Sequence, residues 1–256
     1  MTNGYSGRAE HEIAHGKLLA TAKTETIWGW GTQAGYRRAK RRGDLVAKAA
    51  KLGPGVLALE VGCGTGVFTE LFAQTGATIV AVDISPELLE KAKARGLPVD
   101  RVRFLCQRFE ECNLQGPFDA VVGSSVLHHL EIKPALATIY SLLKPGGIMS
   151  FAEPNMLNPQ IMIERSIPLL RLLMKNTPDE TAFFRWQLAK ALRRARFVDV
   201  RVKPFDFLHP KTPPFWITAV SKVGMLLERL PIVQEIAGSL VITATRGGTQ
   251  QADGNE

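Results

Sequence analysis

The chain has 256 residues, a length that fits one large domain or one domain with a substantial insertion. Hydrophobic residues make up 45% and charged residues 22%, which excludes a largely disordered chain and a polytopic membrane protein. The net charge of +8 lies outside residues 52–154, which lean acidic. Basic flanks around such a middle are typical of a catalytic core whose other segments meet an anionic substrate or surface, or of solvated basic faces.

The cysteines and the apolar runs predict the cellular location of the chain. The three cysteines, Cys63, Cys106 and Cys112, cannot all pair within one chain, and none has the spacing of metal ligands. We therefore expect a reducing cytoplasm and no metal site. No secretion-signal pattern and no apolar run of about 18 residues is present, so we expect no membrane span, while peripheral membrane contact stays open.

Between residues 56 and 153 short apolar runs alternate with helical patterns. Nearly continuous apolar runs indicate strands that are covered on both faces, which predicts a parallel sheet with helices on each side. Pro86 after Ser85 is a good helix start, and residues 144–147, Lys-Pro-Gly-Gly, are a good stop and turn. The predicted strands are Val56–Val61, Ile79–Val82, Val102–Leu105, Phe118–Val122 and Ile148–Ala152, and the predicted helices are Val67–Thr75, Pro86–Arg95 and Ile132–Leu143.

After Glu153 the pattern changes. Ile161–Met174 and Thr181–Arg194 are predicted as amphipathic helices of a helical cap over residues 155–196. Phe197–Lys203 and Leu240–Thr245 are predicted strands within 197–246, with a helical insertion between them, and residues 247–256 are expected to be a disordered tail. The fold class is thus α/β, a Rossmann-like, seven-stranded, mostly parallel sheet with helices on both faces and a reversed strand near one edge.

A glycine-rich loop follows the first predicted strand. Its glycines, Gly62, Gly64 and Gly66, allow a tight turn and close approach of a ligand to the backbone. The spacing is GxGxG, with Val67 where a dinucleotide fingerprint has its third glycine, which disfavours a pyrophosphate. Asp83 ends the second strand, where an acid can accept hydrogen bonds from ribose hydroxyls, and this indicates a nucleoside-bearing cofactor. The alternative is that Asp83 or Ser85 only caps the next helix.

These motifs resemble those of a known superfamily. Residues 60–66, Glu-Val-Gly-Cys-Gly-Thr-Gly, and residues 81–85, Ala-Val-Asp-Ile-Ser, resemble the first two motifs of class I S-adenosylmethionine-dependent methyltransferases. Residues 118–121, 125–130 and 142–147 are similar to the ubiquinone/menaquinone-type branch. The resemblance implies S-adenosyl-L-methionine as cofactor and methyl transfer to oxygen or carbon of a small, lipophilic molecule such as a quinone precursor, polyketide or lipid-linked intermediate, with no nucleic acid expected.

Two other functions stay open. One is a non-catalytic partner subunit that binds the cofactor, and the other is a methyltransferase for a nucleic acid or a protein, which the basic flanks favour. Many relatives carry an acid after the third strand to meet the adenine, whereas Arg108 stands near that place here. Gln107 or backbone groups near Phe109 would then meet the adenine, with Phe109 either against the ring or in the core.

The resemblance also assigns roles to individual residues. The glycine loop would lie against the amino-acid end of the cofactor, Glu60 would support the loop, and Asp83 would hold the ribose. Glu12–Arg42 resembles a leader helix that covers the cofactor, so residues 1–51 are expected to form a helical lid. Arg42, with Arg38 second, is the candidate clamp for the methionyl carboxylate unless these are solvated arginines. The cofactor-binding candidates are Arg42, Glu60, Gly62, Cys63, Gly64, Thr65, Gly66, Asp83, Ile84, Gln107, Arg108, Phe109 and Ser124.

Candidate catalytic residues follow the fourth and fifth strands. His128 and His129 lie where the carboxyl edge of a sheet forms its ligand crevice, and Glu153 ends the fifth strand. Each is a candidate base or substrate contact, and ordinary packing is the alternative for the histidines; His209 is a weaker candidate. The apolar Ile161–Met174 would line a pocket, lie on an anionic membrane surface or pack on the core.

Overall fold

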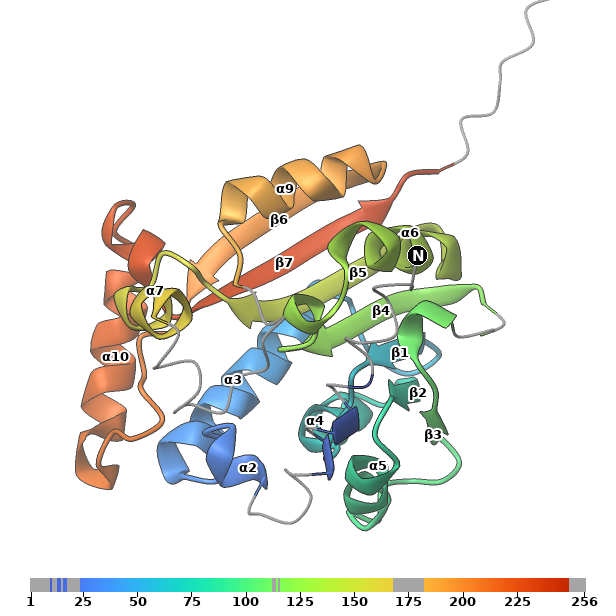
Figure 1. Ribbon diagram of the computed structural model, residues 1–256, viewed down its shortest axis with the longest axis horizontal. Helices are drawn as coiled ribbons and strands as arrows, with labels where there is room; N and C mark the ends of the chain where they lie inside the picture. The colour runs from blue at the N-terminus through green and yellow to red at the C-terminus, as the bar shows by residue number, and fades with distance from the viewer. Residues whose placement is uncertain are drawn as a thin grey trace, which may run out of the picture.

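The computed structural model describes residues 24–111, 114, 116–167 and 182–248, together with 10, 13, 14, 16 and 17. Seven strands form one sheet in the order β3-β2-β1-β4-β5-β7-β6 (Figure 1). Strands β1 to β5 are parallel, and β7 runs antiparallel to both β5 and β6. The strands are β1 Leu57–Val61, β2 Thr78–Asp83, β3 Val102–Cys106, β4 Phe118–Ser124, β5 Leu143–Pro154, β6 Phe197–Phe205 and β7 Ser239–Arg246.

The predicted fold class is therefore confirmed, including the reversed strand near one edge. One local prediction is wrong, since Lys144-Pro145-Gly146-Gly147 is not a turn that precedes the fifth strand. These residues already belong to β5, and the register against β4 jumps from the pair Phe118 and Leu143 to the pair Ala120 and Ile148. Gly146 has φ +78°, so the turn-forming residues make a bulge inside the strand.

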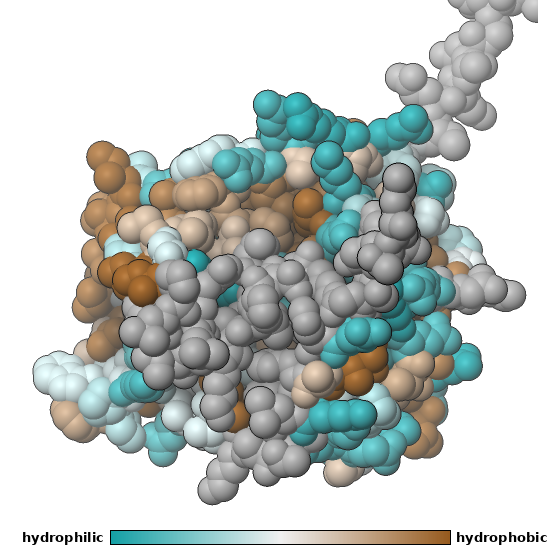
Figure 2. Space-filling view, viewed as in Figure 1, coloured by the Kyte–Doolittle hydropathy of each residue, from teal (hydrophilic) through white to brown (hydrophobic). Residues whose placement is uncertain are grey.

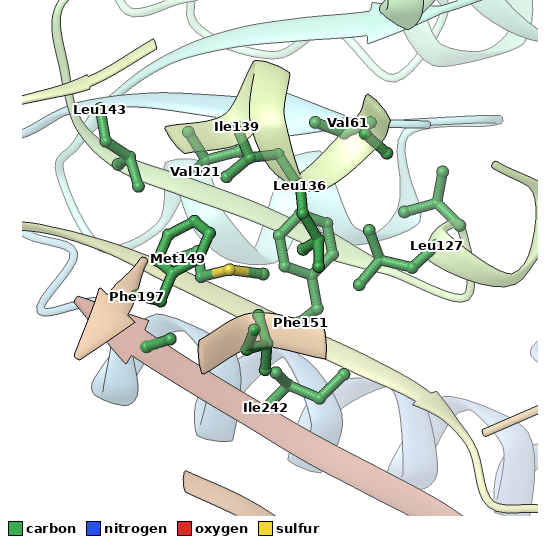
Figure 3. Close-up of a cluster of buried hydrophobic side chains, with 14 of the residues drawn as sticks. Val61, Val121, Leu127, Leu136, Ile139, Leu143, Met149, Phe151, Phe197 and Ile242 are labelled. Atoms are coloured by element: carbon green, nitrogen blue, oxygen red, sulfur yellow. The ribbon is translucent and has the colours of Figure 1, made fainter. Parts of the chain in front are cut away.

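Alternating side chains of the sheet divide the core into two layers. On one face Leu59, Val121 and Phe151 pack with side chains of α6 (Ile132–Leu142) and α9 (Arg185–Arg194), as Figure 3 shows in part. On the other face Ala58 and Ala120 pack with side chains of α3 (Gln33–Ala49), α4 (Val67–Ala73) and α5 (Pro86–Lys93). The period of two is the one expected for strands that are buried on both sides.

The N-terminal residues do not form one helix up to Arg42. Within the described part, α2 (Thr24–Ile27) is followed by a turn in which Gly29 has φ +78°, and α3 then begins after Thr32. The Thr32 hydroxyl accepts from the Gly35 N–H at 2.9 Å, which is the N-cap that starts α3. Glycine and an N-cap threonine thus interrupt the predicted leader helix. Most of residues 1–23 lies outside the described residues.

The remaining helices follow the sheet. Helix α5 begins at Pro86, as predicted, and the Ser85 hydroxyl caps it by accepting from the Leu88 N–H at 3.3 Å. In the predicted cap, α7 is Pro159–Ser166 and α9 starts at Arg185; residues 168–181 lie outside the described residues, as do Cys112 and the tail from 249. The insertion between β6 and β7 contains η3 (Pro214–Trp216), α10 (Ile217–Leu227) and η4 (Val233–Ile236). Two further short turns are η1 (Phe109–Glu111) and η2 (Leu127–His129).

Within the described ranges, no helix has both the length and the apolar character that a bilayer span requires.

The packing of α6 on the sheet should contribute strongly to stability. Leu136 is 1% exposed in the layer between α6 and the sheet. Leu136→Ala should lower the free energy of unfolding by about 2–5 kcal/mol, because it removes buried methyl groups and leaves a cavity. Urea denaturation measures this change. Val99, which is 95% exposed, gives the control Val99→Ala, expected to stay within about 0.5 kcal/mol of the wild type; equal effects would contradict the assigned core.

Candidate functional site

The candidate site lies at the edge where β1, β2, β4 and β5 end. Val61, Asp83, Ser124 and Pro154 are the last residues of these strands. The chain order reverses between β1 and β4, and such a switch point opens a crevice at the carboxyl edge of an α/β sheet. Because β7 is antiparallel, its first residue, Ser239, reaches the same edge beside Pro154.

The glycine loop lines this edge in a conformation that favours glycine. Gly62, Gly64 and Gly66 have φ values of +66°, +52° and +78°. The Gly62 N–H donates to the Val82 carbonyl at 2.8 Å, which ties the loop to β2. A Cβ on Gly62 would lie 2.3 Å from a methyl carbon of Val126, so a larger residue does not fit there. Within the loop, Cys63 and Thr65 are buried.

Asp83 connects the loop to the end of β2. Its Oδ2 accepts from the Gly64 N–H at 2.7 Å and its Oδ1 accepts from the Ser85 N–H at 2.9 Å. The side chain of Ser85, not that of Asp83, caps α5. Since Asp83 is 9% exposed and each carboxylate oxygen can accept a second hydrogen bond, the residue is suited to hold the loop and a ribose hydroxyl together.

Two ionisable side chains are buried at this edge. Glu60 is 1% exposed, and its Oε2 has no hydrogen-bond partner among the described residues. Burial raises the pKa of Glu60 to about 8, although the Thr69 side chain opposes this rise, and Asp83 adds to it. Arg42 is 2% exposed, and burial, with Arg38 nearby, lowers its pKa to about 10 against the opposing effect of Asp206 and Glu153. Buried polar groups normally find partners, so both side chains are candidates for contact with polar groups of a ligand.

Three serine hydroxyls hold the Arg42 guanidinium. Its Nε donates to Ser124 Oγ at 2.9 Å, and its Nη atoms donate to Ser239 Oγ at 2.7 Å and Ser125 Oγ at 3.4 Å. No ion pair joins Arg42 to a carboxylate of the described chain, whereas Arg38 pairs with Asp206 at 2.7 Å. Arg42 is thus the better candidate for an incoming carboxylate. Ser124 was a predicted site residue, whereas Ser125, although it opens the motif at 125–130, and Ser239, which lies in no motif, were not.

The N-terminal segment lies over the glycine loop. A Cβ on Gly64 would meet the ring of Trp28 at 3.0 Å, so the Trp28 ring covers that glycine. Glu25 of α2 accepts from the Thr65 hydroxyl at 3.3 Å and pairs with Arg95. Trp30 instead packs edge-on against Phe68 at 5.6 Å and belongs to the core. One tryptophan therefore covers the site and the other supports it.

The remaining cofactor-binding candidates, of which Gln107 and Phe109 were predicted to meet the adenine, lie after β2 and β3. Ile84 is half-buried, Gln107 is exposed, and the Gln107 N–H donates to the Asp83 carbonyl at 3.0 Å. Arg108 pairs with Glu111 at 2.7 Å and lies 3.5 Å from Glu110. Phe109 is 5% exposed in the main core cluster, which favours its alternative as a core residue.

A buried histidine and carboxylate face each other at the ends of β4 and β5. His128 Nδ1 lies 2.7 Å from Glu153 Oε2, while Glu153 Oε1 accepts from the Val126 and Leu127 N–H groups at 3.0 and 2.9 Å. Burial opposes the ionised form of Glu153, but these hydrogen bonds outweigh it and lower the pKa of Glu153. His128 and Glu153 thus form a buried, hydrogen-bonded pair in which Nδ1 is the ring nitrogen that faces the carboxylate.

The other histidine candidates differ from His128. His129 stacks obliquely on His128, with ring centroids 4.1 Å apart, while the Glu153 carboxylate bonds to His128 Nδ1. His209 is exposed in the insertion, where its Nδ1 accepts from the Lys211 N–H at 3.1 Å. The described residues contain no group of three metal-ligating side chains. His128 is the one joined to the crevice carboxylate.

Comparison with known proteins places this geometry in a family context. Residues 59–151 match the family model described as a methyltransferase domain. This part of the chain is similar to the methyltransferase domain family. The match includes the glycine loop, Asp83 and His128, so the predicted resemblance is confirmed on the residues that carried it.

Individual relatives agree with the domain assignment. The chain is similar to a ubiquinone biosynthesis O-methyltransferase of Xylella fastidiosa, with 33% identity over 159 residues that span 59% of this chain and 64% of that relative. The fold of the chain also resembles two solved structures. One is an S-adenosylmethionine-dependent methyltransferase of Thermotoga maritima, a possible histamine N-methyltransferase, with TM-score 0.62 and 19% identity over 91% of this chain and 99% of that one. The other is phosphoethanolamine N-methyltransferase 2 of Haemonchus contortus in complex with S-adenosyl-L-methionine, with TM-score 0.63 and 16% identity over 91% and 60%.

The raised pKa of Glu60 makes stability depend on pH. The pKa rises from 4.5 to about 8 on folding. The folded state therefore binds this proton more tightly, and its contribution to stability is lost as pH rises through that window. Glu60→Gln is neutral throughout, so its free energy of unfolding should rise relative to the wild type by about 1 kcal/mol per pH unit between these pKa values. Urea denaturation of both proteins at several pH values measures the difference, and a difference that does not change with pH would contradict a neutral, buried Glu60.

Proposed function

We propose that the chain is an S-adenosylmethionine-dependent methyltransferase that methylates a hydroxyl oxygen, or an activated ring carbon, of a small lipophilic molecule. The carrying observation is the pair of buried groups beside the glycine loop, Glu60 and Arg42, which complements an amino-acid end. When bound, the cofactor supplies a methyl group on a sulfonium. Everything else in the reaction is alignment and proton transfer, which the residues of the crevice provide.

The cofactor would be held at three places. The Arg42 guanidinium would donate to the methionyl carboxylate, and the serines that already orient it keep the fork in place. Glu60 would accept a hydrogen bond from the ammonium group, and Asp83 would accept from the ribose while it holds Gly64. Trp28 and α2 would exclude water from the loop. This set fits the cofactor that the family resemblance implies.

His128 is the proposed general base. Glu153 fixes the imidazole through Nδ1, so Nε2 can take the proton of an acceptor hydroxyl, and the ionised carboxylate stabilises the imidazolium that forms. Because Glu153 also accepts two backbone N–H groups, it is rigid and keeps the ring in one orientation. Glu153 is thus a positioning residue in this proposal.

The acceptor class rests on two supports. The sequence is similar to proteins named ubiquinone biosynthesis O-methyltransferases, and a histidine base suits a phenolic hydroxyl, which is weakly acidic.

The proposed domains are an N-terminal lid, a cofactor core and a helical cap. Trp28 and α2 are the part of the lid nearest to the glycine loop.

Removal of the guanidinium tests the cofactor site. Arg42→Gln should weaken binding of S-adenosylhomocysteine by about 2–3 kcal/mol, because a charged hydrogen bond to the carboxylate is lost. Isothermal titration calorimetry measures the affinity, after mass spectrometry has shown that the protein carries no ligand. The control is Arg37→Gln on the same helix, where the arginine is exposed and donates to the Thr218 hydroxyl at 3.4 Å. Equal affinities of wild type and Arg42→Gln would remove the assigned role.

Removal of the imidazole tests the chemistry. His128→Ala should lower kcat for methylation of an alkylated catechol about 10²–10⁴-fold and leave the Kd of S-adenosylhomocysteine unchanged, because a base acts on the acceptor proton. His129→Ala is the matched control, since its ring lies beside His128 without the bond to Glu153. Transfer of a labelled methyl group gives kcat. A larger loss for His129→Ala than for His128→Ala would exclude His128 as the base.

A further inference from the structure

The insertion between β6 and β7 exposes many large apolar side chains. Within η3, α10 and the turns after it, exposed fractions reach 77% for Phe215 and 87% for Ile232. Helix α10 itself buries only Ile217 and Gly224. Soluble chains seldom expose a continuous surface of this kind, and when they do it marks an interaction site. Its main members are Phe215, Trp216, Val223, Leu226, Leu230 and Ile232, together called here the β6–β7 face.

Polar contacts fix this insertion to the body of the molecule. Arg41 of α3 donates through both Nη atoms to the Glu228 carboxylate at 2.7 and 2.6 Å. Asn155, which follows β5, donates through Nδ2 to the carbonyls of Glu235 and Ala237, each at 2.8 Å. The insertion is therefore anchored on its inner side, and its apolar side chains remain directed outward.

The exposed charged side chains of the insertion are all basic. Its three acids are each bound by an arginine: Asp206 by Arg38, Glu228 by Arg41 and Glu235 by Arg185. Its exposed charged side chains are Lys211, Lys222 and Arg229. A second copy packed face to face would bring these cations together, whereas an anionic lipid surface would attract them. The combination of exposed tryptophan, phenylalanine and basic residues is typical of segments that lie in a membrane interface.

The β6–β7 face also adjoins the crevice. Ser239, which accepts a hydrogen bond from Arg42, follows the insertion directly, and Asn158 at the start of α7 donates to the Ile236 carbonyl at 2.9 Å. Helix α7 adds exposed apolar side chains at Met162, Ile163 and Ile167. Figure 2 shows hydrophobic residues along the left-hand side, where Figure 1 places α10 and α7.

We propose that the β6–β7 face docks the chain on an anionic lipid bilayer, with its aromatic and aliphatic side chains in the headgroup region and Lys211, Lys222 and Arg229 against the anionic headgroups. The surface is argued from exposure and charge alone and does not depend on the proposed methyl transfer. This surface lies on a different segment from Ile161–Met174, of which residues 168–174 lie outside the described residues.

Vesicle flotation of the full chain tests this surface. Wild type should float with vesicles of phosphatidylcholine and phosphatidylglycerol and bind at least about tenfold more weakly to phosphatidylcholine alone. The double substitution Phe215→Ser and Trp216→Ser should weaken binding to the anionic vesicles by about tenfold or more, and so should Lys222→Glu with Arg229→Glu. Matched controls on other elements are Val99→Ser, 95% exposed, and Arg103→Glu on β3 at the far edge of the sheet; both should bind as wild type.

The outcomes are distinct. Loss of flotation in the two double variants, with circular dichroism spectra like that of wild type, supports the docking surface. No flotation of wild type, equal binding to neutral and anionic vesicles, or undiminished binding of the double variants would overturn it. A dimer in light scattering that Phe215→Ser with Trp216→Ser dissociates would overturn it too, because a second copy would then be the occupant. Calorimetric binding of S-adenosylhomocysteine, unchanged in all these variants, separates this result from a failure of the proposed function.

Discussion

The buried Arg42 guanidinium is the constraint on which the crevice depends. Arg42 comes from α3, yet its hydrogen bonds end on Ser124 at the end of β4 and Ser239 at the start of β7. One side chain therefore joins α3 to two strands of the sheet. Burial of a cation is unfavourable, and the serine hydroxyls together with the rings of Trp30 and Phe205 compensate for it in part. An anionic group of a ligand would complete this environment. The glycine loop and the unpartnered Glu60 oxygen lie at the same edge.

The chemistry at the crevice follows from how the sheet is wound. Parallel strands bring Asp83, Ser124 and Glu153 to one edge although they are far apart in sequence, and the switch between β1 and β4 leaves room there. Each acid then acquires a different environment. Asp83 accepts the Gly64 and Ser85 N–H groups, hydrogen bonds lower the pKa of Glu153, and burial raises the pKa of Glu60. The proposed function gives these three carboxyl groups separate roles at one edge.

The sequence predicted the sheet well because each of its buried strands is a nearly continuous apolar run. The observed strands β1 to β4 start and end within two residues of the predicted ones. The prediction of a turn at Lys144-Pro145-Gly146-Gly147 was wrong, because these residues pair with β4 and form a bulge within β5. Ser125 and Ser239 could not be predicted as partners of Arg42, since their proximity comes from strand pairing over long separations and no spacing encodes it. The sequence likewise could not distinguish the role of His128 from that of His129. The observed contact between His128 and Glu153 was needed for that.

The central claim is that Arg42 receives the carboxylate of an S-adenosyl ligand at the end of the glycine loop. A crystal structure of the chain with S-adenosylhomocysteine tests it most directly. The account predicts the ligand carboxylate within hydrogen-bond distance of the Arg42 guanidinium and the ribose hydroxyls on Asp83. A ligand bound in the crevice with its carboxylate in solvent, or on another basic residue, would contradict it.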